Sequence, residues 1–370
     1  MHVTLLQAHP CPAPSMKRIA QALHRYLPVP SDIRYASPSP PAVLRRGLPA
    51  AAIHVLYVLH ARRYLQRMAA RIPPCEVLHI VDHSESFLLP AVRARLRVVA
   101  CHDLIPLAAE QVVYRHSLSR WLGRWLYRLT VRDIARADGV IACSHATAQD
   151  VLRFLSIAPE RLKVVYHGVD PDLFVPLREE ERQRYRQEMG YGTQEIVLLH
   201  VGSNAPYKNV PAVLHTVAYL RNNGQPVRWI KAGQPLSPSL QRMAQELGIA
   251  DCLHVEGSLD DASLLRLYQT CDVLLFPSVR EGFGLPVLES LACGTPAVIA
   301  DTPALNEWAS GVCLSAPPND IRALAERVLH SAEASHSPGY RARLREFAMQ
   351  YSWREITRQL VQAYREWGAP

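Results

Sequence analysis

The chain of 370 residues lacks a long hydrophobic run. Hydrophobic residues make up 49% of the sequence and charged residues 20%, yet nowhere do about eighteen uncharged apolar residues follow one another, the length that a bilayer requires. The amino-terminal residues also lack the basic and apolar stretches of a secretory signal. We therefore expect a cytoplasmic protein, either soluble or held peripherally at the inner face of the plasma membrane.

Clustered cysteines are also missing. The eight cysteines are scattered, no two have CxxC spacing, and several lie within apolar runs such as VVAC and VIAC. This pattern is typical of small buried residues in a reducing compartment rather than of a disulfide framework. A structural zinc site needs clustered ligands, which this spacing does not supply.

Lysine is scarce, and the basic charge is unevenly distributed. Residues 1–180 hold 23 basic and 14 acidic residues, a net charge of +9, whereas residues 181–370 hold 18 and 19, a net charge of −1. The first half therefore favours an anionic partner such as a phospholipid surface, a lipid phosphate or a nucleic acid. Only four of the 41 basic residues are lysines: Lys17, Lys163, Lys208 and Lys231.

What the sequence does contain is a regular alternation of short apolar runs with amphipathic segments of helical length. Runs that stay hydrophobic at successive positions predict strands covered on both faces, as in the parallel sheets of α/β proteins. The predicted strands of the first half are residues 2–7, 77–81, 97–101, 139–143 and 163–167. Those of the second half are residues 195–201, 227–231, 252–255, 272–276, 296–300 and 312–315.

The interval between these two series of strands predicts two domains. From residue 172 the charged stretch DLFVPLREEERQRYRQEMG introduces no strand and is typical of a linker followed by a helix. We predict one doubly wound domain over residues 1–178, completed by a closing helix at about 353–370, and a second over 179–352. Ligands of doubly wound sheets bind beyond the carboxyl ends of the strands, so we expect the motifs to line a cleft between the domains.

The segment EGFGLPVLESLACGTP, residues 281–296, combines a glycine-rich loop with the start of a helix. Gly282 and Gly284 let the backbone approach a ligand closely, and Pro286 is suited to open a helix that Gly294 ends. The amino end of such a helix presents unpaired N–H groups and a positive dipole. This segment therefore predicts a phosphate site.

Two carboxylates, Glu281 and Glu289, accompany this loop. A carboxylate beside a phosphate is unfavourable unless it binds hydroxyl groups, so both glutamates are better suited to the hydroxyls of a sugar. A phosphate site together with hydroxyl ligands predicts a nucleotide sugar. The alternative is that the loop needs glycine and proline for its geometry alone and that the glutamates lie there by chance.

The longer segment EGFGLPVLESLACGTPAV resembles the signature of the retaining glycosyltransferases of family 4, which have the GT-B fold of two Rossmann-like domains facing across a cleft. VGSNAPYKN (201–209) is similar to the family's glycine turn, where a basic residue reaches the donor diphosphate. HDLIPL (102–107) is similar to the first-domain loop whose histidine faces the donor sugar. Residues 137–174 and the closing SW…AYREW segment match in order and spacing, so the resemblance covers most of the chain.

The resemblance implies a role for each matching residue. Glu281 would bind hydroxyls of the transferred sugar, Glu289 would bind the ribose, and Lys208 would neutralise the diphosphate and help it depart. The glycine turn, the backbone around the motif loop and the EGSL loop (256–259) that would hold the base add further donor contacts. These contacts are Gly202, Ser203, Phe283, Gly284, Leu285, Gly257, Ser258 and Leu259.

His102, which is followed by Asp103, would hydrogen-bond to the donor sugar; the other interpretation is a capped or core histidine at a strand end. We do not expect a general base. The resemblance implies a front-face reaction in which the leaving diphosphate accepts the proton of the acceptor. It implies no cofactor and no metal, since no DxD motif is placed at the diphosphate and Lys208 with the helix dipole would supply the positive charge.

The sequence departs from the family pattern in two loops. Many relatives have an arginine before the lysine of the second-domain loop, where this chain has Tyr207, so one expected phosphate contact is missing unless Arg280 or another residue replaces it. The first-domain loop HPCPAPSMKR (9–18) has three prolines and no glycine. Its backbone is not expected to approach a phosphate in the usual way.

Two arginine-rich segments of the first half, residues 60–72 and 114–138, are candidates for peripheral contact with an anionic membrane. In the second segment Trp121 and Trp125 lie among arginines that recur every fourth residue, which suits a helix at a membrane interface. The alternative is that both segments are core-packing helices with solvated arginines. No motif for binding nucleic acid accompanies them.

The leading interpretation is a retaining, metal-independent hexosyltransferase of glycan or polysaccharide biosynthesis. It would transfer a hexose from GDP-mannose or a UDP-hexose to a saccharide or lipid-linked acceptor. The alternatives are a GT-B nucleotide-sugar epimerase and a non-catalytic binding protein with a decayed site. A nicotinamide oxidoreductase is disfavoured, because neither HPCPAP nor VGSNAP supplies the GxGxxG motif.

Overall fold

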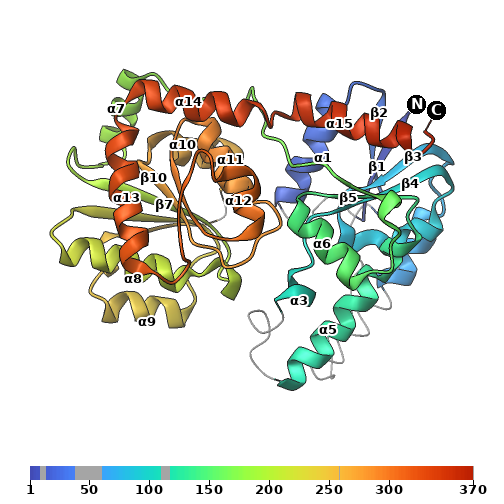
Figure 1. The fold of residues 1–370 in the computed structure, drawn as a ribbon, viewed down its shortest axis with the longest axis horizontal. Helices are drawn as coiled ribbons and strands as arrows, with labels where there is room; N and C mark the ends of the chain where they lie inside the picture. Colours follow the sequence, from blue (N-terminus) through green and yellow to red (C-terminus); the bar gives the residue numbers. More distant parts are fainter. Residues whose placement is uncertain (9–13, 38–60, 110–116, 258, 370) are drawn as a thin grey trace. The chain divides into compact units, whose positions relative to one another are not determined.

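The computed structural model describes residues 1–8, 14–37, 61–109, 117–257 and 259–369, and these form two compact units (Figure 1). The first unit comprises Met1–His167 with Trp353–Pro370, and the second comprises Gly168–Ser352.

The second unit begins at Gly168, whereas the sequence predicted a boundary near residue 178. Val169 pairs with Ser352, and the guanidinium of Arg345 donates to the carbonyl oxygens of Pro171 and Phe174. The segment expected to be a linker is therefore bound to the second unit by backbone pairing and by a partly buried arginine.

The described part of the first unit contains a six-stranded parallel sheet in the order β2-β1-β3-β4-β5-β6. All five predicted strands are present, and the sequence analysis missed β2, a polar strand at the edge of the sheet whose backbone pairs with β1 alone. The strands are β1 (Val3–Gln7), β2 (Ser31–Tyr35), β3 (Cys75–Ile80), β4 (Ala94–Cys101), β5 (Gly139–Ala142) and β6 (Leu162–Val164).

The closing helix of the chain packs within the first unit. Helix α15 (Trp353–Glu366) contacts α1 (Pro14–Tyr26), and the hydroxyl of Thr357 donates to the carbonyl oxygen of Tyr26 (Figure 1). A Cβ atom on Gly139 would lie 2.3 Å from the ring of Trp367, so this glycine is needed where the chain end closes over β5. Other helices of this unit are η1 (His83–Ala91), α3 (Ile105–Ala108), α5 (Ser117–Val131), η2 (Arg132–Arg136), α6 (His145–Phe154) and η3 (Pro159–Arg161), and residues 61–69 are also helical.

The second unit likewise contains, within its described residues, a six-stranded parallel sheet, in the order β12-β11-β10-β7-β8-β9. All six predicted strands are present. Strands β7 and β10 are neighbours, but the chain continues from β7 toward β8 and from β10 toward β11. The loops that follow them therefore diverge at a topological switch point, where ligands of doubly wound sheets bind. The strands are β7 (Ile196–Gly202), β8 (Val227–Gly233), β9 (Leu253–Glu256), β10 (Val273–Phe276), β11 (Ala297–Ala300) and β12 (Leu314–Ala316).

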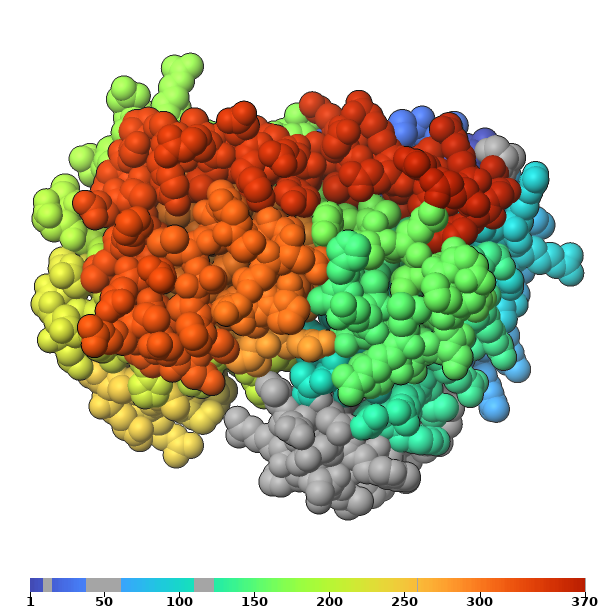
Figure 2. Space-filling view, in the orientation of Figure 1, coloured from blue at the N-terminus to red at the C-terminus, as the bar shows by residue number. Residues whose placement is uncertain are grey.

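Helices cover both faces of this second sheet (Figure 1). One group packs on a hydrophobic core around Leu198, Val213 and Trp229, and it consists of α8 (Val210–Asn222), α9 (Pro238–Glu246) and α13 (Ile321–Ser335). The other consists of α7 (Glu179–Glu188), α10 (Asp261–Thr270), α11 (Leu285–Ala292) and α14 (Pro338–Met349), with α11 against α14. In the space-filling view the red surface of the last helices of this unit adjoins the orange surface of the segment after β10 (Figure 2). The connections contain η4 (Pro206–Lys208), η5 (Ala250–Cys252) and α12 (Pro303–Ala309).

Candidate functional site

The turn after β7 forms as the glycine motif predicts. Gly202 has a φ of 153° and pairs with Gly233 of β8, where a Cβ atom would lie 2.8 Å from the carbonyl oxygen of Gly202. The close approach of the two strand ends therefore requires glycine at position 233, and at position 202 the positive φ favours glycine. The N–H of Ser203 forms no hydrogen bond with the described residues, so the turn retains an available backbone donor.

Asn209 connects this turn to the loop after β10. It is the one non-glycine among the described residues with positive φ, 54°, and it stands at the amino end of α8. Its side-chain amide donates to the carbonyl oxygens of Pro277 and Pro318. The N–H of Val279 donates to the carbonyl oxygen of Tyr207 at 2.8 Å. The sequence analysis did not single out Asn209, although a residue that tolerates left-handed backbone is expected at such a turn.

Lys208 and Glu281 meet at the switch point. The Nζ atom of Lys208 lies 2.7 Å from Oε1 of Glu281, and the two side chains are only 15% and 8% exposed. The ammonium group also lies 5.0 Å from the ring centre of Phe276 and 5.5 Å from that of Tyr207. The sequence analysis assigned both charged residues to the site but did not predict this ion pair. Tyr207, which replaces an expected arginine, contributes its ring to the surroundings of the lysine.

The loop between Glu281 and α11 presents its backbone. Gly284 has a φ of 97°, and a Cβ atom there would lie 2.6 Å from Leu305, so glycine is required. The ring of Phe283 is buried and stacks on Trp308 at 4.8 Å, and the indole N–H donates to the carbonyl oxygen of Phe283 at 2.9 Å. The N–H groups of Gly284 and Leu285 have no hydrogen-bond partner among the described residues. An anion could accept from both groups at the amino end of α11.

Glu289 is buried on α11 rather than exposed at the surface. Its Oε2 atom accepts a hydrogen bond of 2.9 Å from the hydroxyl of Tyr268, a fully buried residue of α10. The sequence analysis did not find Tyr268, because nothing in the local pattern LLRLYQT distinguishes it from a core residue. Its hydroxyl orients the carboxylate that the resemblance assigns to the ribose.

A buried lysine and a buried histidine lie beneath the glycine turn, and the sequence analysis assigned neither to the site. The ammonium of Lys231, on β8, donates to the carbonyl oxygens of Gly202 and Ala232. Burial, and then the charge of Lys208, lowers the pKa of Lys231 to about 8. Burial lowers the pKa of His200 to about 3, so its ring is neutral at physiological pH. A lysine in the apolar strand VRWIK was the signal that could have drawn attention to this position.

The predicted nucleobase loop follows β9 at the same edge of the sheet. The carbonyl oxygen of Gly257 accepts from the N–H of Gly233 at 3.2 Å, and apart from its chain neighbours no described residue has an atom within 4 Å of a Cβ built on Gly257. Leu259 follows in the loop, and Ser258 lies outside the described residues. The role of this loop stays a prediction.

His102 belongs to the first unit, and its ring is engaged within that unit. Its Nε2 atom lies 2.6 Å from the carbonyl oxygen of Val81, and its Nδ1 atom lies 3.1 Å from Nε2 of His167. Burial and the neighbouring His83 lower the pKa of His102. Both ring nitrogens therefore have partners, which corresponds to the core-histidine interpretation. Binding a sugar would require His102 to exchange one of them.

Several arginines of the basic segments of the first unit pair with a carboxylate of the same unit and are less available to an anionic partner than the composition indicates. Arg62, Arg132 and Arg136 all lie around the buried carboxylate of Asp133. Trp125 on α5 is 45% exposed, while the residues 60 and 114–116 and the side chains of 117–122, including Trp121, lie outside the description. Among the helices that the structure describes, none has the length and apolar character to span a membrane.

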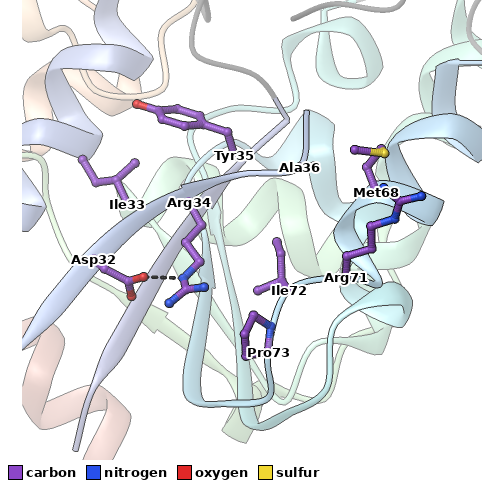
Figure 3. Close-up of a pocket in the computed structure, with 9 residues that line it drawn as sticks. All are labelled: Asp32, Ile33, Arg34, Tyr35, Ala36, Met68, Arg71, Ile72 and Pro73. Atoms are coloured by element: carbon purple, nitrogen blue, oxygen red, sulfur yellow. Dashed lines mark hydrogen bonds and ion pairs between the residues drawn. The ribbon is translucent and has the colours of Figure 1, made fainter. Parts of the chain in front are cut away.

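The first unit also has an open hollow of about 510 Å³ beside edge strand β2 (Figure 3). It is lined by Arg34 from β2, by Met68 near the end of the helical residues 61–69 and by Arg71 in the turn that follows, and Arg34 pairs with Asp32. No predicted site residue lies there. Of the proline-rich segment predicted as a loop, residues 14–18 instead form the start of helix α1, and residues 9–13 lie outside the description.

Metal ligands are not gathered in the described ranges. There, no three histidine, cysteine, aspartate or glutamate side chains are placed to hold a metal ion. The seven described cysteines are free thiols and five of them are buried, in agreement with the sequence interpretation.

Two family models match the chain. Residues 9–173 match "Glycosyltransferase Family 4", and residues 181–350 match "Glycosyl transferases group 1". The chain is 29% identical over 267 residues to the MMP alpha-(1->4)-mannosyltransferase of Mycolicibacterium hassiacum, covering 70% of this chain and 61% of the relative. It is 28% identical over 279 residues to the serotype-specific mannosyltransferase WbdA of Escherichia coli, covering 70% of this chain and 33% of the relative. The chain thus spans between one third and about three fifths of these two relatives.

Solved structures show the same fold. HepE of Anabaena, solved in complex with UDP-glucose, has a TM-score of 0.75 at 18% identity, with 99% of both chains covered. Sucrose-phosphate synthase of Thermosynechococcus elongatus has a TM-score of 0.73 at 18% identity, with 99% of this chain and 98% of that chain covered. These likenesses and the two parallel sheets confirm the predicted GT-B fold of two Rossmann-like domains.

Proposed function

The chain belongs to the family 4, or group 1, glycosyltransferases, and we propose that it transfers a hexose from a nucleotide diphosphate sugar to a saccharide or lipid-linked acceptor with retention of configuration. One observation carries this proposal. Lys208 and Glu281 form a largely buried ion pair at the switch point, in the same loop region as the N–H groups of Gly284 and Leu285, which have no partner in the part of the chain that the structure describes. A lysine, two backbone donors and a carboxylate suit a ligand with both phosphate and hydroxyl groups.

The ion pair suggests how the donor would bind. A diphosphate carries more charge than a carboxylate and would compete with Glu281 for the ammonium of Lys208. Glu281 would then be free to accept hydrogen bonds from hydroxyls of the transferred sugar. The same ammonium would stabilise the charge that develops on the leaving diphosphate, which is where electrostatic catalysis has its largest effect.

Glu289 would hold the nucleotide rather than take part in the chemistry. Its carboxylate is buried and oriented by Tyr268, which suits a fixed pair of hydroxyls such as those of a ribose. The donor would be GDP-mannose or a UDP-hexose, since the named relatives are mannosyltransferases and HepE was solved with UDP-glucose. The transfer would proceed on the front face without a metal, with the leaving diphosphate accepting the proton of the acceptor.

A thermal-shift screen tests the proposal. The purified protein is heated with UDP, GDP, ADP and their common sugar conjugates, together with the variant Glu289→Ala and the control Glu326→Ala, whose exposed carboxylate on α13 pairs with Arg322. We expect one nucleotide to raise the melting temperature of the wild type and the control but not of Glu289→Ala.

The donor found in this screen is then incubated with saccharide and lipid-linked acceptors. Release of the nucleoside diphosphate together with an α-configured product from an α-configured donor supports retaining transfer. Conversion of the donor to its epimer would instead establish the epimerase alternative. The absence of any nucleotide shift would favour a decayed site.

A further inference from the structure

Lys231 occupies an unusual position for a lysine. Its side chain is fully buried in β8, and among the described residues no carboxylate forms an ion pair with it. Its ammonium group donates to the carbonyl oxygen of Gly202, which also accepts from the N–H of Gln234 at 3.3 Å. Both donors therefore hold this carbonyl on the β8 side of the turn.

Because the peptide bond is planar, the hydrogen bond from Lys231 to the carbonyl oxygen of Gly202 also fixes the direction of the next N–H group. In a trans peptide the C=O of Gly202 and the N–H of Ser203 point in opposite directions, and no described peptide bond is cis. Because the carbonyl is held by Lys231, the N–H of Ser203 points away from β8. That N–H has no partner among the described residues, as an anion-binding donor requires.

We propose that Lys231 is a positioning residue for the donor diphosphate: it orients the Gly202–Ser203 peptide so that the N–H of Ser203 faces the phosphate, and it places a second ammonium beneath the site behind Lys208. This inference rests on the proposed function and adds a residue to it. The resulting site combines a direct contact from Lys208 with a buried charge that touches no ligand.

A second buried polar group, His200, lies under the turn with only one of its two ring nitrogens bonded. The Nδ1 atom of His200 lies 3.1 Å from the carbonyl oxygen of Leu275, whereas its buried Nε2 atom has no hydrogen-bond partner in the described chain. That bare nitrogen lies 3.9 Å from the Cβ position built on Gly202. A buried lysine without a counter-ion and a histidine with an unused nitrogen are both unfavourable for stability alone.

Binding of an anion is expected to change the protonation of Lys231. Its charged neighbours are Lys208 on η4, which is paired with Glu281, and the neutral His200 on β7. On β9 its partner is Val255, whose neighbours His254 and Glu256 pair with each other. Since the pKa of Lys231 is about 8, an anion above it raises this pKa and the complex takes up a proton at alkaline pH. Affinity for the anion should therefore fall as the pH rises through 8.

The experiment is isothermal titration calorimetry of the whole chain with inorganic pyrophosphate, UDP and GDP, at pH 7 and pH 9 and in buffers of different ionisation enthalpy. Lys231→Met removes the charge and the hydrogen bond, whereas Lys231→Gln retains a donor without the charge. Lys163→Met is the control, because Lys163 lies in the first unit and pairs with Glu366. The melting temperature of each variant is measured without ligand. If one Lys231 variant is unfolded, the binding measurement on the other still tests the inference.

We expect Lys231→Met to bind pyrophosphate and the nucleotide about ten- to a hundredfold more weakly at pH 7, the effect of losing a charged hydrogen-bonding group. The same variant should melt at a higher temperature than the wild type, because an apolar side chain of similar length replaces a buried charge. The wild type and Lys163→Met should lose affinity from pH 7 to pH 9 with proton uptake, and both Lys231 variants should show neither effect.

Unchanged affinity and unchanged pH dependence in both Lys231 variants would overturn the inference and leave the proposed function intact. Pyrophosphate binding that depends on Lys231, without binding of any nucleotide, would support the inference and overturn the proposed function. Binding of neither probe to the wild type would overturn both.

Discussion

The two sheets have similar architecture, but the polar groups that follow their strands differ in whether they have hydrogen-bond partners. In the first unit both ring nitrogens of His102 have partners, His167 and the carbonyl oxygen of Val81, whereas His79 binds the hydroxyl of Tyr364 through Nδ1 alone. In the second unit the loops after β7 and β10 place Lys208 against Glu281 and retain backbone donors that no described residue pairs with. Yet the first half of the sequence has a net charge of +9 and the second a net charge of −1. Local geometry, and not net charge, identifies the candidate anion site.

The largest effect is expected at Glu281. Replacement by alanine should reduce transfer about a thousandfold or more while the protein stays folded, because the sugar would lose a hydrogen-bonding carboxylate at the reacting centre. Turnover with the donor identified in the thermal-shift screen, alongside circular dichroism, measures both properties. The Glu326→Ala control should retain full activity. A Glu281→Ala protein as active as the wild type would remove this residue from the site.

The next largest effect is expected on stability, where the two buried aspartates that bind arginines, Asp272 and Asp133, can be compared. Asp272 accepts from Arg182, Arg186 and the N–H of Val197, and both arginines are almost fully buried. Asp272→Asn should therefore lower the free energy of unfolding by about 3–5 kcal/mol. Urea titration monitored by tryptophan fluorescence measures this change.

Asp133→Asn in the first unit is the matched variant for Asp272→Asn. Two of its three arginines, Arg132 and Arg136, are 59% and 61% exposed, so solvent screens their charge. We expect a smaller loss of stability than for Asp272→Asn. Equal losses would contradict the difference in burial on which the comparison depends.

Glu289 should separate binding from chemistry. Glu289→Ala should weaken nucleotide binding by about ten- to a hundredfold, the loss of a charged hydrogen-bonding partner, and transfer should recover at saturating donor. Initial rates over a range of donor concentrations give KM and kcat separately. Tyr268→Phe, which removes only the hydroxyl that orients Glu289, should raise KM less. A fall in kcat with unchanged KM would instead place Glu289 in the chemical step.

The buried histidines predict a pH dependence of stability shared by both units. Burial lowers the pKa of His79 and of His200 to about 3, below the value of about 6.5 in an unfolded chain. Between these values the unfolded state binds more protons, so stability falls as the pH falls from 6.5 toward 3. Each histidine contributes about 1.4 kcal/mol per pH unit. Urea titrations at several pH values should show a smaller slope for His200→Gln and for His79→Gln, and an unchanged slope in both would contradict this origin.

The smallest effect is expected at the surface of the first unit. We propose that the exposed indole of Trp125 contributes to peripheral contact with anionic membranes, and that Trp125→Ala reduces sedimentation with phosphatidylglycerol vesicles by about threefold or less. Arg132 and Arg136 should contribute little, since both lie beside Asp133. Equal sedimentation with neutral vesicles would contradict an electrostatic contact.

Eleven of the twelve described strands were predictable from the sequence, because a strand covered on both faces requires a continuous apolar run. The exception is β2, an edge strand whose SDIRY sequence has no such run. The resemblance placed Lys208, Glu281 and Glu289 in one site. It did not reveal Tyr268 or Asn209, because their contacts reach residues on other elements.

The sequence by itself determined the two series of strands and the glycines at the turns, since these depend on local apolar runs and backbone conformation. Only the tertiary structure decided which polar groups meet. Lys208 and Glu281 are 73 positions apart, and Lys231 and Gly202 are 29 apart, yet each pair forms a hydrogen bond. Strand order and register bring these groups together, and neither is encoded in the spacing of residues along one segment.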